Sequence, residues 1–270
     1  MEIVVGAVSD KGNIKPTNQD NFLVKIYEDN NRDIGLFVMC DGMGGLSFGE
    51  IASSISVKYF KEWFDKHYER IINEKDEKKI TEFMAKIIEV VNTKIRDYGK
   101  KESVKVGTTV SALLLCNDIY YIAHVGDSRI YKINKEIKQL TEDHTLVAMN
   151  VRNNIMTEIE AKNSAKKNIL TQCVGVKENI EVFKERGKIN KNDVFVLCCD
   201  GFYNKFEEEE LYSEIKKIKN IIDNDVLQEA AQKFVNKVKE RGEKDNISII
   251  IVGFVSDEGF IDKLKKHVGF

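Results

Sequence analysis

Proline is almost absent from this sequence, with one residue in 270, and no stretch rich in glycine, proline or serine divides the chain. The absence of such a linker favours one domain over two. No apolar run approaches the ~20 residues that a membrane-spanning helix needs, so we expect no direct contact with a membrane. Lysine and arginine (42) nearly balance aspartate and glutamate (44). The formal charge of −2 therefore gives no overall basic surface for nucleic acid or an anionic membrane.

The cysteines lack the spacing of a metal or redox motif. There are five, an odd number, mostly in apolar runs, and no two have Cys-x-x-Cys spacing: Cys40, Cys116, Cys173, Cys198 and Cys199. We predict reduced thiols in the core of a cytoplasmic protein rather than disulfides or a zinc site. The first ten residues also lack the basic region and longer apolar stretch of a signal peptide, which favours the same location.

Strand patterns and helix patterns alternate along the chain. We predict strands at Ile3–Val8, Asn21–Ile26, Leu36–Cys40, Thr108–Cys116, Ile119–His124, Ser128–Ile133, Val194–Cys199 and Ile247–Val252. We predict helices at Gly49–His67, Glu77–Tyr98, Glu207–Lys217, Asp225–Arg241 and, more weakly, from Asp257 onward. Short turns such as Asn117-Asp118 indicate antiparallel pairing rather than parallel crossover units. The expected fold class is α+β, with antiparallel sheets covered by helices.

Two of the apolar runs end in Asp-Gly. Residues 36–40 lead into Asp41-Gly42, and residues 194–199 lead into Asp200-Gly201; a third acid, Asp245, stands just before the run that begins at Ile247. A single Asp-Gly is most often a simple turn, because glycine allows positive φ and aspartate caps its own backbone. Two that directly follow buried strands instead suggest carboxylates that converge at strand ends. Converging carboxylates repel one another unless a cation lies between them.

Other segments supply further candidates in chain order. A turn-rich stretch contains Lys15 and ends at Asp20, just before the second predicted strand. Asp127 lies in a tight turn, Val-Gly-Asp-Ser-Arg, between two strands, and His144 follows in Leu-Thr-Glu-Asp-His. An oxygen-only set with no cysteine or histidine cluster favours Mg²⁺ or Mn²⁺ over zinc.

The order and spacing of these motifs, from Val8 to about Val252, resemble the metal-dependent Ser/Thr protein phosphatases of type 2C, in particular their compact bacterial members. The resemblance implies a four-layer sandwich of two antiparallel β-sheets flanked by helices. It also implies hydrolysis of phosphoserine and phosphothreonine in proteins by a hydroxide that bridges two Mn²⁺ or Mg²⁺ ions, without a covalent intermediate. Residues 1–255 would form one catalytic domain with a flap at about 145–168, and residues 256–270 a helical extension of it.

The resemblance also assigns roles to single residues, matched one at a time. Asp41 matches the acid that bridges both metals, and the carbonyl of Gly42 matches a ligand of the second. Asp200 and Asp245 match the remaining ligands of the first metal, and with Asp41 they form the expected catalytic set. Asp20 matches the acid that serves the second metal, directly or through water.

A third, weaker metal is a further possibility that the family raises. Asp127 matches the acid that, with Asp200, binds it in many bacterial members. The alternative, that Asp127 is a turn residue bonding its neighbouring amides, is equally compatible with the sequence. We expect Asn246 and Ser128 to support the site or its turns rather than to bind metal.

Three departures from the family pattern stand out. Lys15 occupies the place of an arginine that grips the substrate phosphate through a bidentate fork, and a lysine offers only a point charge. Met43 replaces the histidine proton donor of animal members, as is common in bacterial ones. Residues 171–175 read Thr-Gln-Cys-Val-Gly where Thr-Arg-Ala-Leu-Gly is usual, which concerns flap packing more than metal binding.

Two features admit more than one interpretation. The polar stretch 145–168 is either a flap over a site or an ordinary surface connection; its position between motifs favours the flap. His144 either acts as a general acid or orders the entrance to that flap through hydrogen bonds, and we expect the second.

Three hypotheses for function follow. The first is an active phosphoprotein phosphatase, favoured because every matched metal-ligand position keeps its acid. The second is a binding or regulatory module of the same fold, and the third is a phosphohydrolase of small molecules. On the first, the partners are proteins phosphorylated by a Ser/Thr kinase, and we expect a monomer.

Overall fold

The computed structural model describes residues 2–29, 32–43 and 48–255. Within these residues the strands are β1 (Ile3–Asp10), β2 (Asn21–Asp29), β3 (Arg32–Cys40), β4 (Val110–Cys116), β5 (Ile119–Val125), β6 (Arg129–Ile133), β7 (Ile137–Gln139), β8 (Phe183–Lys188), β9 (Val194–Cys198) and β10 (Ile247–Phe254). The helices are α1 (Gly49–Asn73), α2 (Glu77–Glu102), α3 (Leu146–Arg152), α4 (Glu158–Lys162), α5 (Asp200–Tyr203), α6 (Glu208–Ile218) and α7 (Asn224–Glu240).

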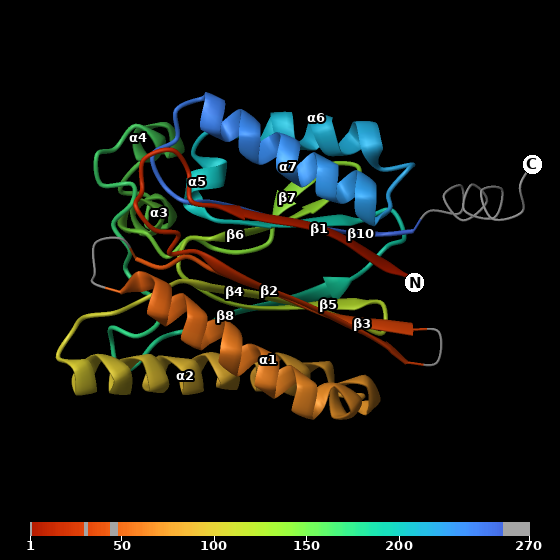
Figure 1. Ribbon diagram of the computed structural model, residues 1–270, viewed down its shortest axis with the longest axis horizontal. Helices are drawn as coiled ribbons and strands as arrows, with labels where there is room; N and C mark the ends of the chain where they lie inside the picture. Colours follow the sequence, from red (N-terminus) through yellow and green to blue (C-terminus); the bar gives the residue numbers. More distant parts are fainter. Residues whose placement is uncertain (1, 30–31, 44–47, 256–270) are drawn as a thin grey trace, which may run out of the picture.

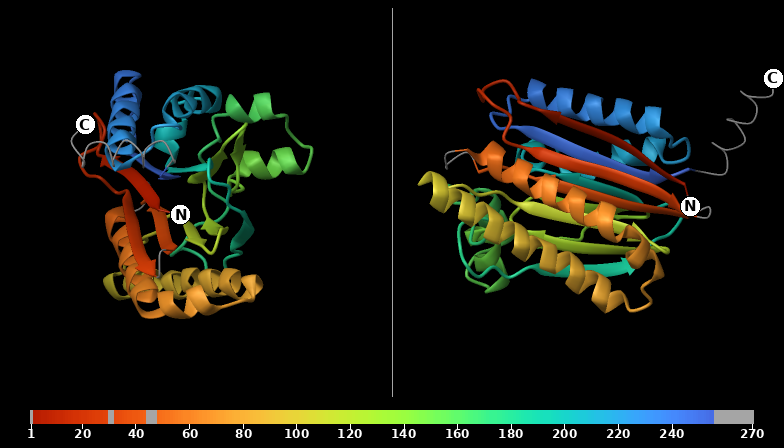
Figure 2. Two further views of the ribbon diagram at one scale, coloured as in Figure 1. Left: turned by 90° about the vertical axis from the view of Figure 1, so that its right-hand side faces the viewer. Right: turned by 60° about the horizontal axis from the view of Figure 1, so that its bottom comes forward.

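The strands form two five-stranded antiparallel sheets that pack face to face. One has the order β1-β10-β9-β6-β7 and the other β2-β3-β4-β5-β8. Helices α6 and α7 cover the outer face of the first sheet, and α1 and α2 cover the outer face of the second (Figure 1; Figure 2). The predicted α+β fold of four layers, helix-sheet-sheet-helix, is confirmed.

Three apolar layers fill the spaces between these elements, which explains why the strand sequences are apolar on both faces. In β3, Leu36 and Val38 contribute to the layer that includes α1 and α2, whereas Phe37 and Met39 contribute to the layer between the sheets. Each strand side chain points to the face opposite its neighbour's. A central strand therefore buries a continuous apolar run.

Sequence patterns located most elements but missed two short strands. β7 and β8 were not predicted; β8 has the sequence Phe-Lys-Glu-Arg-Gly-Lys and lies at a sheet edge, where its residues are half-buried or exposed without alternation. α1 and α2 each continue beyond the predicted ends at His67 and Tyr98. The helix predicted from Asp257 onward lies outside the described residues.

All five cysteines are buried and unpaired, as predicted. Among the described residues, no helix has both the length and the apolar character needed to cross a bilayer.

The outer edge of β1 is covered by α7 rather than left open. Asn224 accepts a hydrogen bond from the backbone of Val5, and Gln228 both donates to and accepts from the backbone of Ala7. A Cβ added to Gly6 would lie 2.2 Å from the backbone carbonyl atoms of Leu227. The absence of a side chain at Gly6 thus allows α7 to protect an edge strand.

We expect Gly6→Ala to lower the free energy of unfolding by about 3 kcal/mol, because the helix backbone must move away from the strand. Gly242→Ala is the matched control: its φ is +74° and nothing lies within 4 Å of the added Cβ. That substitution costs only conformational strain, about 1 kcal/mol. Urea unfolding of both variants measures the difference, and equal costs would contradict the proposed steric origin.

Candidate metal centre

Four of the predicted acids lie where strands of the two sheets begin or end. Asp20 immediately precedes β2 and Asp41 immediately follows β3; because Asn21 pairs with Cys40, these two acids are adjacent across the hairpin. Asp200 begins α5 two residues after the end of β9, and Asp245 stands two residues before β10. β9 and β10 are antiparallel neighbours, so the second pair also shares one end of its sheet. The two pairs meet at the end of the sandwich where α5 lies (Figure 1).

The side chains of the cluster are close together and range from buried to partly exposed: Asp41 and Asp200 are half-buried, and the Asp245 side chain is 43% exposed. Asp20, Asp41 and Cys199 offer ligand atoms that all lie within 4.8 Å of one another. Asp20 is only 8% exposed, and Ser248 Oγ donates a hydrogen bond of 2.6 Å to its Oδ2. Asp127, from the turn between β5 and β6, is also buried. The structure thus brings the predicted acids together from segments that are far apart in sequence.

Burial and mutual repulsion raise the pKa values of Asp20, Asp41 and Asp200. The pKa of Asp20 rises to about 7, mainly through burial, with the charges of Asp200 and Asp245 adding to it. The pKa of Asp200 rises to about 6 through burial and the charge of Asp245. The pKa of Asp41 is held well above its usual value by burial and by Asp20, Asp200, Asp127 and Asp245. Such a cluster stabilises a cation placed among its members.

Asp127 is electrostatically coupled to the same cluster. Its pKa is raised well above the usual value by burial and by the charges of Asp200 and Asp143, against the effect of Arg129. Arg129 itself pairs with Asp143, with a 2.8 Å contact from its Nη2. The arginine charge is therefore largely matched by Asp143. The charges of Asp127 and Asp200 therefore influence each other, whereas the third metal site stays a prediction.

Lys15 points at the centre. Its Nζ lies 2.7 Å from Asp245 Oδ1, and its side chain is 30% exposed. Burial acts to lower the pKa of Lys15, but the hydrogen bond and charge of Asp245, together with Asp41 and Asp200, raise it. The ammonium group therefore stays charged at the open side of the carboxylate cluster.

The backbone around Gly42 is held in place by two threonines, Thr108 and Thr109, that immediately precede β4. Thr108 Oγ1 and Thr109 N each donate to the carbonyl oxygen of Asp41 at 2.8 Å, and the Asp41 N–H donates to Thr109 Oγ1 at 2.9 Å. A Cβ on Gly42 would lie 2.5 Å from the carbonyl oxygens of Gln19 and Gly49. Only glycine fits there, whereas the role of its carbonyl as a ligand stays a prediction.

Three supporting groups of the cluster were not identified from sequence. Ser248 binds Asp20, Thr109 anchors Asp41, and Cys199 Sγ lies beside both acids while accepting from the Ser248 N–H at 3.1 Å. Burial and the nearby acids raise the pKa of the Cys199 thiol well above its usual value, so the group stays neutral. A serine inside the otherwise apolar run of β10 was the signal that could have marked Ser248.

Two histidines, His124 and His144, support the turn that carries Asp127. His144 is 7% exposed and makes two hydrogen bonds with Gly126. Its ring Nδ1 accepts from the Gly126 backbone N–H at 3.1 Å, and its backbone N–H donates to the Gly126 carbonyl oxygen at 2.7 Å. It thereby joins the Asp127 turn to the start of the flap, in agreement with the ordering role expected from sequence. The buried His124 ring packs against it at 5.1 Å between centroids, and burial lowers the pKa of His124 to about 3.

The predicted flap contains two short helices, α3 and α4. The Leu146 N–H donates to the Ile169 carbonyl at 2.8 Å, which closes the segment at its base. Thr157 and Glu160 form a reciprocal capping box at the start of α4. Ile155 and Ile159 are 71% and 76% exposed. Flap closure over the centre stays a prediction.

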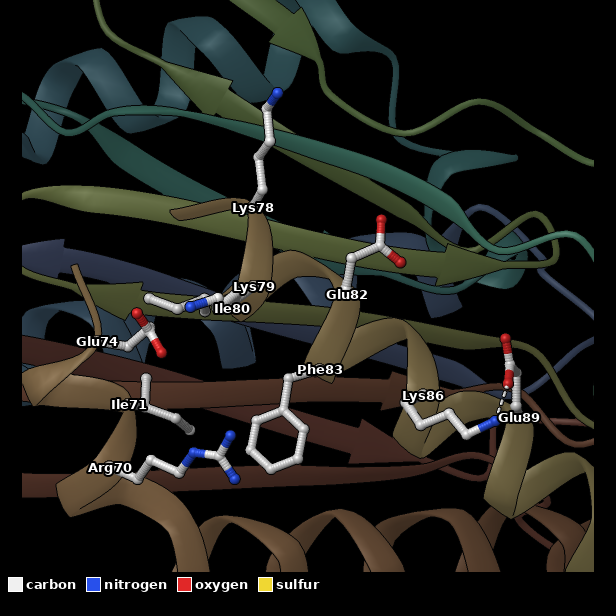
Figure 3. Close-up of a pocket in the computed structure, with 10 residues that line it drawn as sticks. All are labelled: Arg70, Ile71, Glu74, Lys78, Lys79, Ile80, Glu82, Phe83, Lys86 and Glu89. Carbon is white, nitrogen blue, oxygen red and sulfur yellow. Dashed lines mark hydrogen bonds and ion pairs between the residues drawn. The ribbon is translucent and has the colours of Figure 1, made fainter. Parts of the chain in front are cut away.

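A surface pocket of about 560 Å³ lies between the end of α1 and the start of α2 (Figure 3). The guanidinium of Arg70 stands 5.1 Å from the Phe83 ring centroid there, and Lys86 pairs with Glu89 at 2.7 Å. α1 starts beside the centre, since Gly49 touches Gly42, and its 25 residues span roughly 37 Å. This pocket is therefore far from the carboxylate cluster.

Comparisons with known proteins agree with this geometry. A family model described as protein phosphatase 2C matches residues 15–236. The serine/threonine phosphatase stp of Listeria monocytogenes is 33% identical over 247 residues, which cover 90% of this chain and 93% of that protein. The solved S. agalactiae serine/threonine phosphatase has a TM-score of 0.80 at 28% identity and covers 94% of this chain and 100% of its own.

A further structural neighbour is the catalytic domain of the serine threonine protein phosphatase PstP in complex with two manganese ions. It has a TM-score of 0.74 at 22% identity over 93% of this chain and 97% of that one, a level of identity that compares folds alone. The family match and the stp relative each extend over most of the chain, and the matched residues 15–236 include Asp20, Asp41, Asp127 and Asp200 but end before Asp245. This protein belongs to the protein phosphatase 2C family.

Proposed function

We propose that this protein hydrolyses phosphoserine and phosphothreonine esters in proteins, with two divalent cations held by Asp41, Asp200, Asp245, Asp20 and the carbonyl of Gly42. A third, weaker cation would lie between Asp127 and Asp200. The observation that carries the proposal is the cluster of carboxylates at one end of the sandwich, with Lys15 paired to Asp245 at its partly exposed side. Family membership supports phosphatase chemistry and a requirement for metal.

The donor set fits hard divalent cations. It consists of carboxylates and backbone carbonyls, which Mg²⁺ and Mn²⁺ prefer, and the neighbouring Cys199 thiol is kept protonated. When bound there, the ions would neutralise the acids, withdraw charge from the phosphoryl oxygens and make water a stronger acid. The raised pKa values of Asp20 and Asp200 support this placement, because a cation beside these carboxylates would offset the cost of their burial.

The chain's own groups orient the reactants rather than attack them. Lys15 would bind the phosphate dianion as a point charge. Ser248 and Thr109 hold the carboxyl of Asp20 and the backbone of Asp41 at fixed positions. Cys199, the thiol nearest the acids, has a raised pKa and is a poor nucleophile. These properties favour direct attack by water over a covalent intermediate.

The substrate, partner and location are part of the same proposal. The relatives that match the chain are bacterial serine/threonine phosphatases, which supports phosphorylated proteins as substrates and a Ser/Thr kinase as the enzyme that produces them. We propose that the protein acts as a cytoplasmic monomer and binds neither nucleic acid nor membrane. The near-neutral overall charge supports the last point.

Turnover of p-nitrophenyl phosphate with Mn²⁺ and with EDTA tests the activity. We expect hydrolysis that requires the metal; folded protein that shows none would leave only a binding role. A phosphothreonine peptide and a set of small phosphate esters then test the substrate class. A kcat/KM that favours small esters by orders of magnitude would refute a protein substrate.

We expect Lys15→Arg to lower KM for a phosphothreonine peptide by about threefold with little change in kcat, because a guanidinium can bind two phosphate oxygens at once. Steady-state kinetics at saturating Mn²⁺ measure both constants. Lys11→Arg is the matched control, a substitution in the same loop away from the Asp245 ion pair. An unchanged KM in Lys15→Arg would show that position 15 does not contact the phosphate.

A further inference from the structure

The loop that carries Lys15 is held by hydrogen bonds from one buried side chain near the other end of the sequence, that of Asn246. Asn246 Nδ2 donates to the carbonyl oxygens of Lys11 at 2.9 Å and Thr17 at 3.0 Å. Its Oδ1 accepts from the Gln19 N–H at 2.9 Å. Asn246 is only 3% exposed, and both of its donor hydrogens are used. One amide group thus fixes the loop on both sides of Lys15.

The two segments approach each other closely enough to require glycine. Gly12 has a φ of +76°, and a Cβ there would lie 2.4 Å from the Asp245 carbonyl oxygen. Gly201, next to Asp200, would place a Cβ 2.0 Å from the Asn246 carbonyl oxygen. The segment that contains Asn246 is therefore enclosed between the Lys15 loop and the start of α5.

Asn246 is itself held rigidly. Glu243 Oε1 accepts from the N–H groups of Lys244 and Asp245 at 2.7 and 3.0 Å, and Asp245 Oδ1 accepts from the Asn246 N–H at 2.8 Å. β10 begins at the next residue and is paired on both sides. The amide of Asn246 is thus a fixed point against which the loop is located.

We infer that Asn246 is a positioning residue for phosphate binding: it holds the loop of residues 11–19 against the Asp245 turn, so that the Lys15 ammonium is placed at the centre before substrate arrives. This inference rests on the proposed function. Preorganisation of this kind removes the cost of ordering the loop upon binding. The carboxyl group of Asp20 is held separately by Ser248, and the Asn246 backbone N–H still donates to Asp245 Oδ1 when the side-chain amide is lost.

The inference predicts a specific kinetic signature for Asn246→Ala. We expect KM for p-nitrophenyl phosphate at saturating Mn²⁺ to rise about tenfold, with kcat within about twofold of the parent. In a Lys15→Gln background the same substitution should leave KM unchanged, because the group that it positions is already missing. A merely structural role would instead lower activity by the same factor in both backgrounds.

A second readout needs no catalysis. Trypsin can cleave after Lys11, whereas cleavage after Lys15 is blocked by Pro16. We expect Asn246→Ala to speed cleavage after Lys11 in the full-length, Mn²⁺-loaded protein by about tenfold, followed by mass spectrometry, because the loop then opens locally. Asn13→Ala is the control within the same loop: it loses one exposed hydrogen bond to the Lys239 carbonyl and should change neither cleavage nor KM.

Gly12→Ala displaces the loop from the other side and should reproduce both effects if Asn246→Ala fails to fold. Unchanged cleavage after Lys11, or an equal rise in KM in the Lys15→Gln background, would overturn the inference. If the parent protein hydrolyses no phosphate ester, the proposed function fails, and binding of inorganic phosphate by calorimetry replaces KM. Faster cleavage with weaker phosphate binding would then still support the positioning role.

Discussion

Asp41→Asn is expected to abolish metal-dependent hydrolysis and, at the same time, to stabilise the protein in EDTA. The carboxylate at the centre of the cluster becomes a neutral amide of nearly the same size. Loss of bound metal removes several kcal/mol of transition-state stabilisation, so kcat/KM should fall by about a thousandfold or more. Calorimetric titration with Mn²⁺ should show loss of the tight binding at the same time.

The gain in stability follows from the electrostatics of Asp41. Its pKa is raised well above the usual value by burial and by four neighbouring acids, so its charge opposes folding at neutral pH. Removing that charge should raise the midpoint of thermal unfolding in EDTA and lower the stabilisation that Mn²⁺ provides. Opposite effects on activity and stability are typical of a functional site.

Asp33→Asn is the control, because Asp33 lies at the other end of the same strand. Its Oδ2 accepts a 2.6 Å hydrogen bond from the Ile3 N–H, which an asparagine oxygen can still accept. Activity and Mn²⁺ binding should stay near those of the parent. Retained activity in Asp41→Asn, or a loss of stability in EDTA, would refute the role assigned to Asp41.

The site residues were easiest to predict from the sequence where a carboxylate directly follows a strand-like apolar run. Asp41 and Asp200 follow apolar runs that the structure buries on both faces, so the Asp-Gly steps marked the rim of the sandwich directly. Whether these strand ends converge depends on how the strands pair. The family resemblance implied that pairing, whereas the periodicity of apolar residues did not. The fold class was predictable for the same reason.

Other parts could not be predicted because their signals depend on contacts that are distant in sequence. β8 is polar and exposed, and its strand conformation comes from pairing with β5. The Asn246 amide binds the Lys11 carbonyl across 235 residues, and no local pattern indicates this. Ser248 lies within the apolar run that predicts a strand, and nothing nearby in sequence identifies the group that it binds. A buried hydroxyl needs a hydrogen-bond partner, and in the structure this partner is Asp20.

The carboxylate cluster should also make the stability of the protein in EDTA depend on pH in a specific way. The pKa of Asp20 rises from 3.8 to about 7, chiefly through burial, despite the hydrogen bond from Ser248. Between about pH 4 and pH 7 the folded protein therefore binds more protons at this position than the unfolded chain. The contribution of Asp20 to the free energy of unfolding must therefore fall as pH rises through that range.

Comparison with Asp20→Asn isolates this contribution. Buried histidines act in the opposite direction, since the pKa of His124 is lowered to about 3 by burial, but they are present in both proteins and cancel. The asparagine oxygen still accepts the Ser248 hydrogen bond. Relative to the parent, Asp20→Asn should gain stability between about pH 4 and pH 7 by up to about 1.4 kcal/mol per pH unit.

Urea unfolding at several pH values in EDTA measures this difference, and the same series in saturating Mn²⁺ is its control. A bound cation stabilises the ionised Asp20, so the parent should then be the more stable protein at neutral pH. Parallel pH profiles of the two proteins in EDTA would contradict the raised pKa of Asp20. A gain for Asp20→Asn that persists unchanged in Mn²⁺ would instead place Asp20 outside the metal centre.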